Sequence, residues 1–175
     1  MLHKGLALTV GLTVCLGFHG VASACEKGLE ACPANLTGQA GYFPNQLINS
    51  GGILRSYNIY VPSGYKPTHP TPLVFNFHGQ GGDPEEQNSY TKMDELAELH
   101  KFILVTPRGY DGGVGVPSWN AGTCCWPAND AGIDDVGFVS DMIKKISQNY
   151  CVNPRRTYAT GISNGGNVSD CSGTF

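Results

Sequence analysis

The chain has 175 residues, a formal net charge of −3 and a charged fraction of only 14%. This balance, without a cluster of lysines and arginines, argues against a nucleic-acid partner. The apolar fraction of 41% is ordinary for a globular protein and argues against a wholly disordered chain.

The first residues have the pattern of a secretory signal peptide. A short basic start precedes an almost wholly apolar run, Gly5–Phe18, and Ala22-Ser23-Ala24 fits the small-residue cleavage pattern. The run is shorter than the ~20 apolar residues that a membrane-spanning helix needs, and an N-terminal anchor helix is the alternative. We therefore expect a secreted protein with no membrane partner.

The expected organisation is a signal peptide over residues 1–24, a disulfide-tied lead-in over 25–50 and one partial domain over 51–175. The part that remains after signal removal is long enough for one domain with a hydrophobic core. Two sequons, Asn35-Leu36-Thr37 and Asn167-Val168-Ser169, are glycosylation acceptors if the host is eukaryotic.

Six of the seven cysteines lie beyond the signal segment, and an even number indicates disulfides in an exported chain. They are Cys25, Cys32, Cys124, Cys125, Cys151 and Cys171. The sequence does not choose among their possible pairings. We expect Cys25 and Cys32 to close a local loop, and the adjacent Cys124 and Cys125 to reach different partners, one of them Cys151. A zinc site is the alternative, but the C-x-x-C and H-x(3–5)-H spacings are missing.

Apolar runs and helical patterns alternate along the rest of the chain. Strands are expected at 56–61, 73–77, 102–106 and 156–160, and helices at 91–100 and 134–150. Such alternation is typical of an α/β fold with a mostly parallel sheet and flanking helices. At the start of the second helix, Asp134 is expected as the N-cap and Asp135 as an anion at its positive end, both structural rather than catalytic.

Gly161-Ile162-Ser163-Asn164-Gly165 has the G-x-S-x-G form of a nucleophile elbow, a tight strand-to-helix turn that exposes a serine hydroxyl. The motif alone is a weak signal, but a predicted strand precedes it. The small residues Gly161 and Gly165 would allow the helix to pass close to the sheet. Ser163 is therefore the candidate nucleophile.

A second Gly-rich segment, His78-Gly79-Gln80-Gly81-Gly82, follows the apolar strand at 73–77. Because the carboxyl ends of parallel strands share one edge of a sheet, this segment is expected to lie beside Ser163. The backbone N–H groups of Gln80 and Asn164 would then form an oxyanion hole, with His78 and Gly79 supporting it. An ordinary Gly-rich turn is the alternative.

The partners that a serine nucleophile needs are missing after Ser163. On the fold that uses this elbow, the acid and the histidine follow the serine, yet residues 164–175 contain no histidine. Asp170 is the only acid there, and it is too near in sequence to reach the next strand end. We do not expect His69, His78 or His100 to take the position of the base.

These segments together resemble the secreted feruloyl esterase and polyhydroxybutyrate depolymerase family of α/β-hydrolases. The resemblance rests on Ser56–Tyr65, His78–Gly82, Trp119–Cys125, Asp134–Phe138 and Arg156–Gly166. It implies a serine carboxylic-ester hydrolase that needs no metal or cofactor and acts on plant cell-wall feruloyl or acetyl esters, or on polyester. Ser163 matches the family nucleophile, and the His78 segment matches the oxyanion side. The family's later strands, acid and histidine are missing, so we expect an inactive N-terminal portion of such an enzyme.

Two other functions remain open at this stage. A long Gly-rich loop, 108–133, holds Trp119 and Trp126, and a non-catalytic secreted protein could use it to bind polysaccharide or aromatic ligands. Packing of the two tryptophans inside the loop is the simpler interpretation. A serine peptidase of similar fold would share the elbow.

Overall fold

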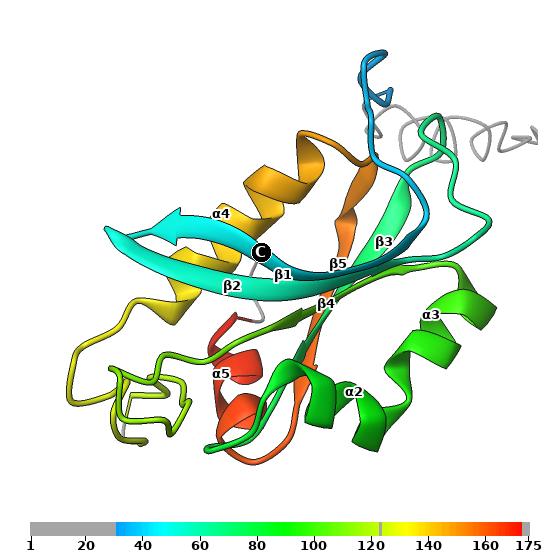
Figure 1. Cartoon of the computed structure of the whole chain (residues 1–175). Coiled ribbons are helices and arrows are strands. Elements are labelled where there is room, and N and C mark those ends of the chain that lie inside the picture. The colour runs from blue at the N-terminus through cyan, green and yellow to red at the C-terminus, as the bar shows by residue number, and fades with distance from the viewer. Residues whose placement is uncertain (1–30, 123, 173–175) are drawn as a thin grey trace, which may run out of the picture. The chain divides into compact units, whose positions relative to one another are not determined.

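The computed structural model describes residues 31–122 and 124–172, together with the side chains up to Asp170. The expected signal peptide and Cys25 lie outside this range. The elements in chain order (Figure 1) are β1 (Gly41–Ser50), β2 (Ile53–Val61), β3 (Thr71–Phe77), α2 (Pro84–Thr91), α3 (Met93–His100), β4 (Ile103–Pro107), α4 (Asp135–Ser147), β5 (Val152–Gly161) and α5 (Asn164–Ser172).

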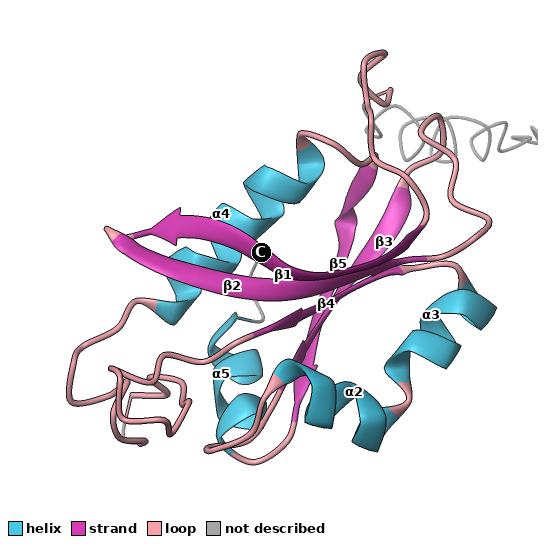
Figure 2. Ribbon diagram, viewed as in Figure 1, coloured by secondary structure: helices cyan, strands magenta, loops and turns pink. Residues whose placement is uncertain are grey.

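The five strands form one sheet in the order β1-β2-β4-β3-β5. β3 pairs in parallel with both β4 and β5, whereas β2 is antiparallel to β1 and β4. Helices α4 and α5 lie on one side of the sheet, and α2 and α3 lie on the other (Figure 2). The expected α/β class is confirmed, although the sheet is mixed rather than mostly parallel, because a hairpin turn at Gly51 and Gly52 folds β1 back on β2.

Two elements were not predicted from the sequence. Strand β1 lies in the segment assigned to the lead-in, and a bulge between Phe43 and Gln46 interrupts the alternation by which a strand is recognised. Helix α2 buries little apolar surface and is defined by its start: the Asp83 side chain accepts from the Glu86 N–H at 2.9 Å, and Pro84 follows it.

The core lies between the central strands and α4. Its largest fully buried side chains include Leu73, Phe75 and Phe77 of β3 and Phe138 and Met142 of α4. Because β3 is buried along its whole length, its sequence is a continuous apolar run, as expected of a central parallel strand. The strand that leads to the candidate oxyanion segment is therefore a rigid part of the molecule.

The disulfides differ from the expected pairing. Cys32 bonds to Cys151, which ties the segment before β1 to the start of β5. Cys124 and Cys125 bond to each other across a cis peptide, so the expectation that they reach different partners is wrong. The local Cys25–Cys32 loop is wrong as well, because Cys32 is already paired. Cys151 is paired with a residue 119 positions away and is therefore not the partner of Cys124 or Cys125.

No helix in the described ranges is long and apolar enough to cross a membrane.

Candidate active site

Ser163 stands in a sharp turn between the end of β5 and the start of α5. Its φ is +53°, a left-handed conformation that non-glycine residues rarely adopt, and its side chain is exposed. The Ile162 N–H donates to the Phe77 carbonyl at 3.1 Å, and the Gly165 N–H donates back to the Ile162 carbonyl at 2.9 Å. The structure therefore has the geometry of a nucleophile elbow at this position.

Two glycines allow the turn to lie against the end of β3. A Cβ added at Gly161 would lie 2.8 Å from the Phe77 carbonyl oxygen and 2.5 Å from the Gly165 carbonyl carbon. A Cβ added at Gly165 would overlap the carbonyl oxygens of Phe77 and His78. Glycine is thus required at positions 161 and 165, because a side chain at either position would clash with neighbouring backbone atoms.

The His78–Gly82 segment lies beside the serine, as the sequence predicted. A Cβ added at Gly79 would lie 3.6 Å from the Ser163 Cβ. The segment is fixed by its own contacts: the Gly82 N–H donates to the Gly79 carbonyl at 3.0 Å, and the Gly81 N–H donates to the Pro117 carbonyl at 2.7 Å. The elbow and the His78–Gly82 segment therefore lie side by side where β3 and β5 end.

The two candidate oxyanion donors lie in these two segments. Asn164 is the first residue of α5, so its N–H has no acceptor within the helix and lies at the positive end of the helix dipole. Gln80 is exposed at the tip of the loop, and its side chain is fixed by donation from Nε2 to the Trp126 carbonyl at 2.6 Å. A developing oxyanion needs two preorganised backbone N–H groups, and these two residues are the candidates for that role.

His78 is a structural bridge rather than a base. Its ring is buried, its Nε2 accepts from the Gly109 N–H at 3.0 Å, and its Nδ1 lies 2.6 Å from the Gly79 carbonyl. The carbonyl can only accept, so the proton is on Nδ1 and the imidazole is neutral. Burial holds the pKa of His78 below its ordinary value of 6.5.

This lowered pKa predicts a loss of stability in mild acid. The unfolded state binds a proton at His78 more readily than the folded state, so the contribution of His78 is fully present above pH ~6.5 and declines as the pH falls toward the folded pKa. The slope is at most about 1.4 kcal/mol per pH unit. Urea unfolding of the wild type and of His78→Asn between pH 5 and 7.5 measures the difference, and parallel curves for the two proteins would refute it.

Trp119 connects the two sides of the site. Its indole N–H donates to the His78 carbonyl at 2.9 Å, its backbone N–H donates to Asn164 Oδ1 at 2.8 Å, and Asn164 Nδ2 donates to the Trp119 carbonyl at 2.9 Å. Trp119 is fully buried and packs edge-on against Phe77. It therefore cannot serve as the exposed ligand platform of the binding-protein alternative, and it instead links the His78–Gly82 segment to the elbow.

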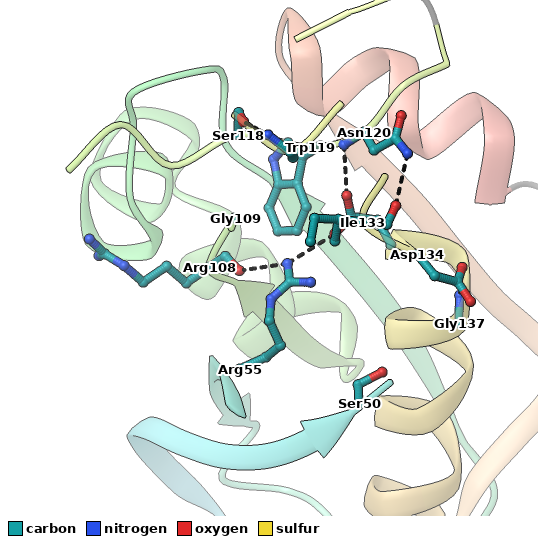
Figure 3. A network of polar contacts seen from close by, with 12 residues as sticks. Ser50, Arg55, Arg108, Gly109, Ser118, Trp119, Asn120, Ile133, Asp134 and Gly137 are labelled. Carbon is teal, nitrogen blue, oxygen red and sulfur yellow. Dashed lines mark hydrogen bonds and ion pairs between the residues drawn. The ribbon is translucent and has the colours of Figure 1, made fainter. Parts of the chain in front are cut away.

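A buried ion pair that the sequence did not reveal lies next to Trp119, with the guanidinium carbon of Arg55 5.9 Å from the centre of the Trp119 ring (Figure 3). Arg55 Nη2 lies 2.9 Å from Asp135 Oδ1 and 3.3 Å from the Arg108 carbonyl, and the other Asp135 oxygen accepts from the Asn120 N–H at 2.7 Å. Burial raises the pKa of Asp135, and Arg55 and the Asn120 N–H partly offset that effect. The start of the 108–133 loop is thereby anchored to β2, and Asn120 in its middle is anchored to α4.

The adjacent acid behaves as expected of a cap. Asp134 Oδ1 accepts from the Gly137 N–H at 2.7 Å at the start of α4. Asp135 differs from the expectation, because its carboxylate is bonded to Arg55 and Asn120 rather than acting on the helix end alone. The only advance signal was an acidic pair at a helix start and one arginine directly before a predicted strand.

The left-handed turn at Ser163 should carry a measurable cost. A non-glycine residue in this conformation destabilises the folded state by about 1 kcal/mol or more. The free energy of unfolding of Ser163→Gly should therefore exceed that of Ser163→Ala by about 1 kcal/mol. Both changes remove the hydroxyl, which makes each the control for the other. Chemical denaturation of the two variants decides the matter, and equal stabilities would mean that the turn is unstrained.

Known proteins resemble this chain in sequence. The chain is 34% identical to feruloyl esterase B of Piromyces equi over 119 residues, which cover 68% of this chain and 21% of that protein. It is 32% identical to a bifunctional acetylxylan esterase/xylanase of Neocallimastix patriciarum over 66% of this chain and 15% of that protein. Feruloyl esterase D of Neurospora crassa is 27% identical over 85% of this chain and 47% of its own length. The chain thus spans less than half the length of these curated relatives.

Solved structures share the fold. The native pOPH structure superposes with a TM-score of 0.57 at 18% identity, covering 79% of this chain and 49% of that one. An acetyl xylan esterase from Aspergillus awamori gives a TM-score of 0.52 at 18% identity, covering 72% and 44%. No protein-family model matches the chain. On its sequence relatives and its fold, the chain belongs to the feruloyl esterase and polyhydroxybutyrate depolymerase-like family of α/β-hydrolases, a family of carboxylic ester hydrolases.

Proposed function

We propose that Ser163 is the nucleophile of a carboxylic ester hydrolase that works through an acyl-enzyme. The observation that carries the proposal is the exposed, left-handed serine beside the loop that follows β3. A surface serine in an ordinary turn needs neither the positive φ nor the two backbone contacts at Gly161 and Gly165. Strained serines of this kind are characteristic of reactive sites.

The chemistry follows from the positions of the donors. The Ser163 hydroxyl attacks the ester carbonyl, a base takes its proton, and the N–H groups of Asn164 and Gln80 receive the oxyanion of the tetrahedral intermediate. The alcohol leaves, and water then releases the acid from the serine ester. Removing one such donor in other enzymes costs ~10²–10³ in kcat, so these amides account for a large part of the rate.

The same structure leads us to propose that residues 1–175 by themselves hydrolyse esters negligibly. His78 is held by Gly79 and Gly109, and no histidine follows Ser163 in the sequence. Without a base, a serine hydroxyl is a weak nucleophile. An oxyanion hole and binding without a triad leave only ~10³–10⁴-fold acceleration over water in a protease.

We also propose that the protein is exported and that its substrates are esters of plant cell walls, feruloyl or acetyl, or a polyester. The signal-like residues 1–24 and the Cys32–Cys151 disulfide support export. The names of the relatives, feruloyl and acetylxylan esterases, support the substrate class.

Imidazole in solution can stand in for a missing histidine and so tests the nucleophile. We expect the 175-residue protein to release acyl groups from p-nitrophenyl acetate and methyl ferulate only when imidazole is added, in proportion to its concentration. Ser163→Ala should show no release above that of imidazole alone.

Two results would contradict this proposal. Equal release by the wild type and Ser163→Ala at every imidazole concentration would remove Ser163 from the chemistry. Turnover without imidazole that vanishes in Ser163→Ala would show that the chain supplies its own base. Hydrolysis of a peptide but no ester would instead favour the peptidase alternative.

A further inference from the structure

Trp126 is exposed although it lies in a segment that the fold holds firmly. Its side chain is 48% exposed, whereas Trp119 in the same loop is fully buried. The backbone around Trp126 is fixed at three points: its own carbonyl accepts from Gln80 Nε2 at 2.6 Å, and the Cys125 carbonyl accepts from Ser118 Oγ at 3.2 Å and from the Asn129 N–H at 3.1 Å. The fixed backbone therefore displays the aromatic face of Trp126 at the surface of the loop.

The same segment touches both candidate oxyanion residues. At one end the Cys124 Sγ lies 4.0 Å from Asn164 Nδ2, and at the other the Trp126 carbonyl is bonded to Gln80. Residues 124–126, which we call the Cys–Trp wall, therefore extend from the side chain of Asn164 to that of Gln80, the two residues whose backbone N–H groups are the proposed oxyanion donors. An ester carbonyl held by those two donors would have one of its substituents against this wall.

The side chains of the Cys–Trp wall offer an uncharged disulfide and a flat aromatic ring. The disulfide between Cys124 and Cys125 carries no proton and no charge, so these two sulfurs present a polarisable surface. The indole of Trp126 adds a flat face that stacks on aromatic rings. Such a wall offers little to an acetyl or hydroxyalkanoyl group and much to a planar aromatic acid.

We propose that the Cys–Trp wall is the acyl-group subsite, and that Trp126 selects planar aromatic acyl groups of the hydroxycinnamic type by stacking on them. The inference rests on the proposed function, because it takes the oxyanion at Gln80 and Asn164. Trp119 has no part in this selection, because its ring is enclosed between Phe77 and His78.

Binding of ferulate to the 175-residue protein tests the subsite without any turnover. The sequence has two tryptophans, so a nitrogen-15 spectrum has two indole N–H signals. Ferulate should shift the Trp126 signal in a saturable way and leave the Trp119 signal in place, while acetate and 3-hydroxybutyrate should shift neither. No saturable shift at Trp126, or an equal shift with acetate, would overturn the proposal.

Variants then assign the effect to the ring. Trp126→Ala should weaken ferulate binding about tenfold, and Trp126→Phe should restore most of it, because loss of a stacked ring typically costs up to that factor. Tyr42→Ala is the matched control, since Tyr42 is 49% exposed and lies on β1, at the opposite end of the strand order from β5. Unchanged affinity in Trp126→Ala, or an equal loss in Tyr42→Ala, would overturn the proposal.

The outcome separates the subsite from the proposed function. Ferulate binding that depends on Trp126, together with acyl release that does not depend on Ser163, would support the subsite and refute the nucleophile. Release that depends on Ser163, with ferulate binding insensitive to Trp126, would support the nucleophile and refute the subsite.

Discussion

Gly165→Ala is expected to destabilise the protein by at least about 3 kcal/mol, because its methyl group would occupy the space of two carbonyl oxygens, those of Phe77 and His78. These oxygens belong to the rigid end of β3, so they cannot move aside as the end of a flexible side chain would. The elbow would have to separate from β3, and the Ile162–Phe77 hydrogen bond would be lost with it. Urea unfolding, or folding yield if the variant does not accumulate, measures the effect.

The neighbouring glycine supplies the control. A Cβ at Gly166 would have its nearest contact at 3.4 Å, an ordinary van der Waals distance, and Gly166 lies inside α5. Gly166→Ala should therefore stabilise the protein by up to ~1 kcal/mol through helix propensity. The prediction about Gly165 fails if the two variants unfold alike.

Asp135→Asn is expected to cost about 3 kcal/mol, because it leaves the guanidinium of Arg55 buried without a counter-charge. The side chains of Arg55 and Asp135 are only 4% and 1% exposed, so water cannot replace the lost partner. For a chain of this size the loss corresponds to a fall in Tm of about 6–12 °C. Thermal unfolding followed by circular dichroism gives the value.

The same substitution one residue earlier is the matched control. Asp134→Asn keeps a good N-cap acceptor for the Gly137 N–H and should change stability by less than about 0.5 kcal/mol. Arg55→Met with Asp135→Asn should cost clearly less than the two single changes added together, since no unpaired buried charge remains. Additive losses would show that the pair is not coupled.

Three of the elements that the sequence predicted follow directly from local patterns. β3 and β4 are buried on both faces and therefore form short apolar runs, and α4 begins with a capping acid. Strand β1 was missed because its bulge breaks the alternation, and α2 was missed because only Pro84 and Gln87 of that helix are buried. A local sequence pattern predicts only local structure, whereas β1 and α2 are held in place by tertiary contacts.

The two backbone turns of the candidate site were predicted from the sequence, but the side-chain contacts that hold them were not. The elbow and the loop after β3 are visible in sequence because glycines are needed where chains meet closely. The links from Trp119 to Asn164 and from Arg55 to Asp135 join residues that are 45 and 80 positions apart, and no spacing rule connects them. The disulfide expectations failed for the same reason, since Cys32 and Cys151 are 119 positions apart.

The alignment of β5 against β3 has a consequence for the chemistry. In the described sheet β5 is the last strand, and Phe77 of β3 is paired with Gly161, two residues before the serine. Side chains on a strand change faces with every step, so a slip of one residue between these two strands would carry the hydroxyl about 3.3 Å along the sheet and turn it away from its amides. If Ser163 is the nucleophile as proposed, its reactivity depends on the alignment of these two strands as much as on the identity of the serine.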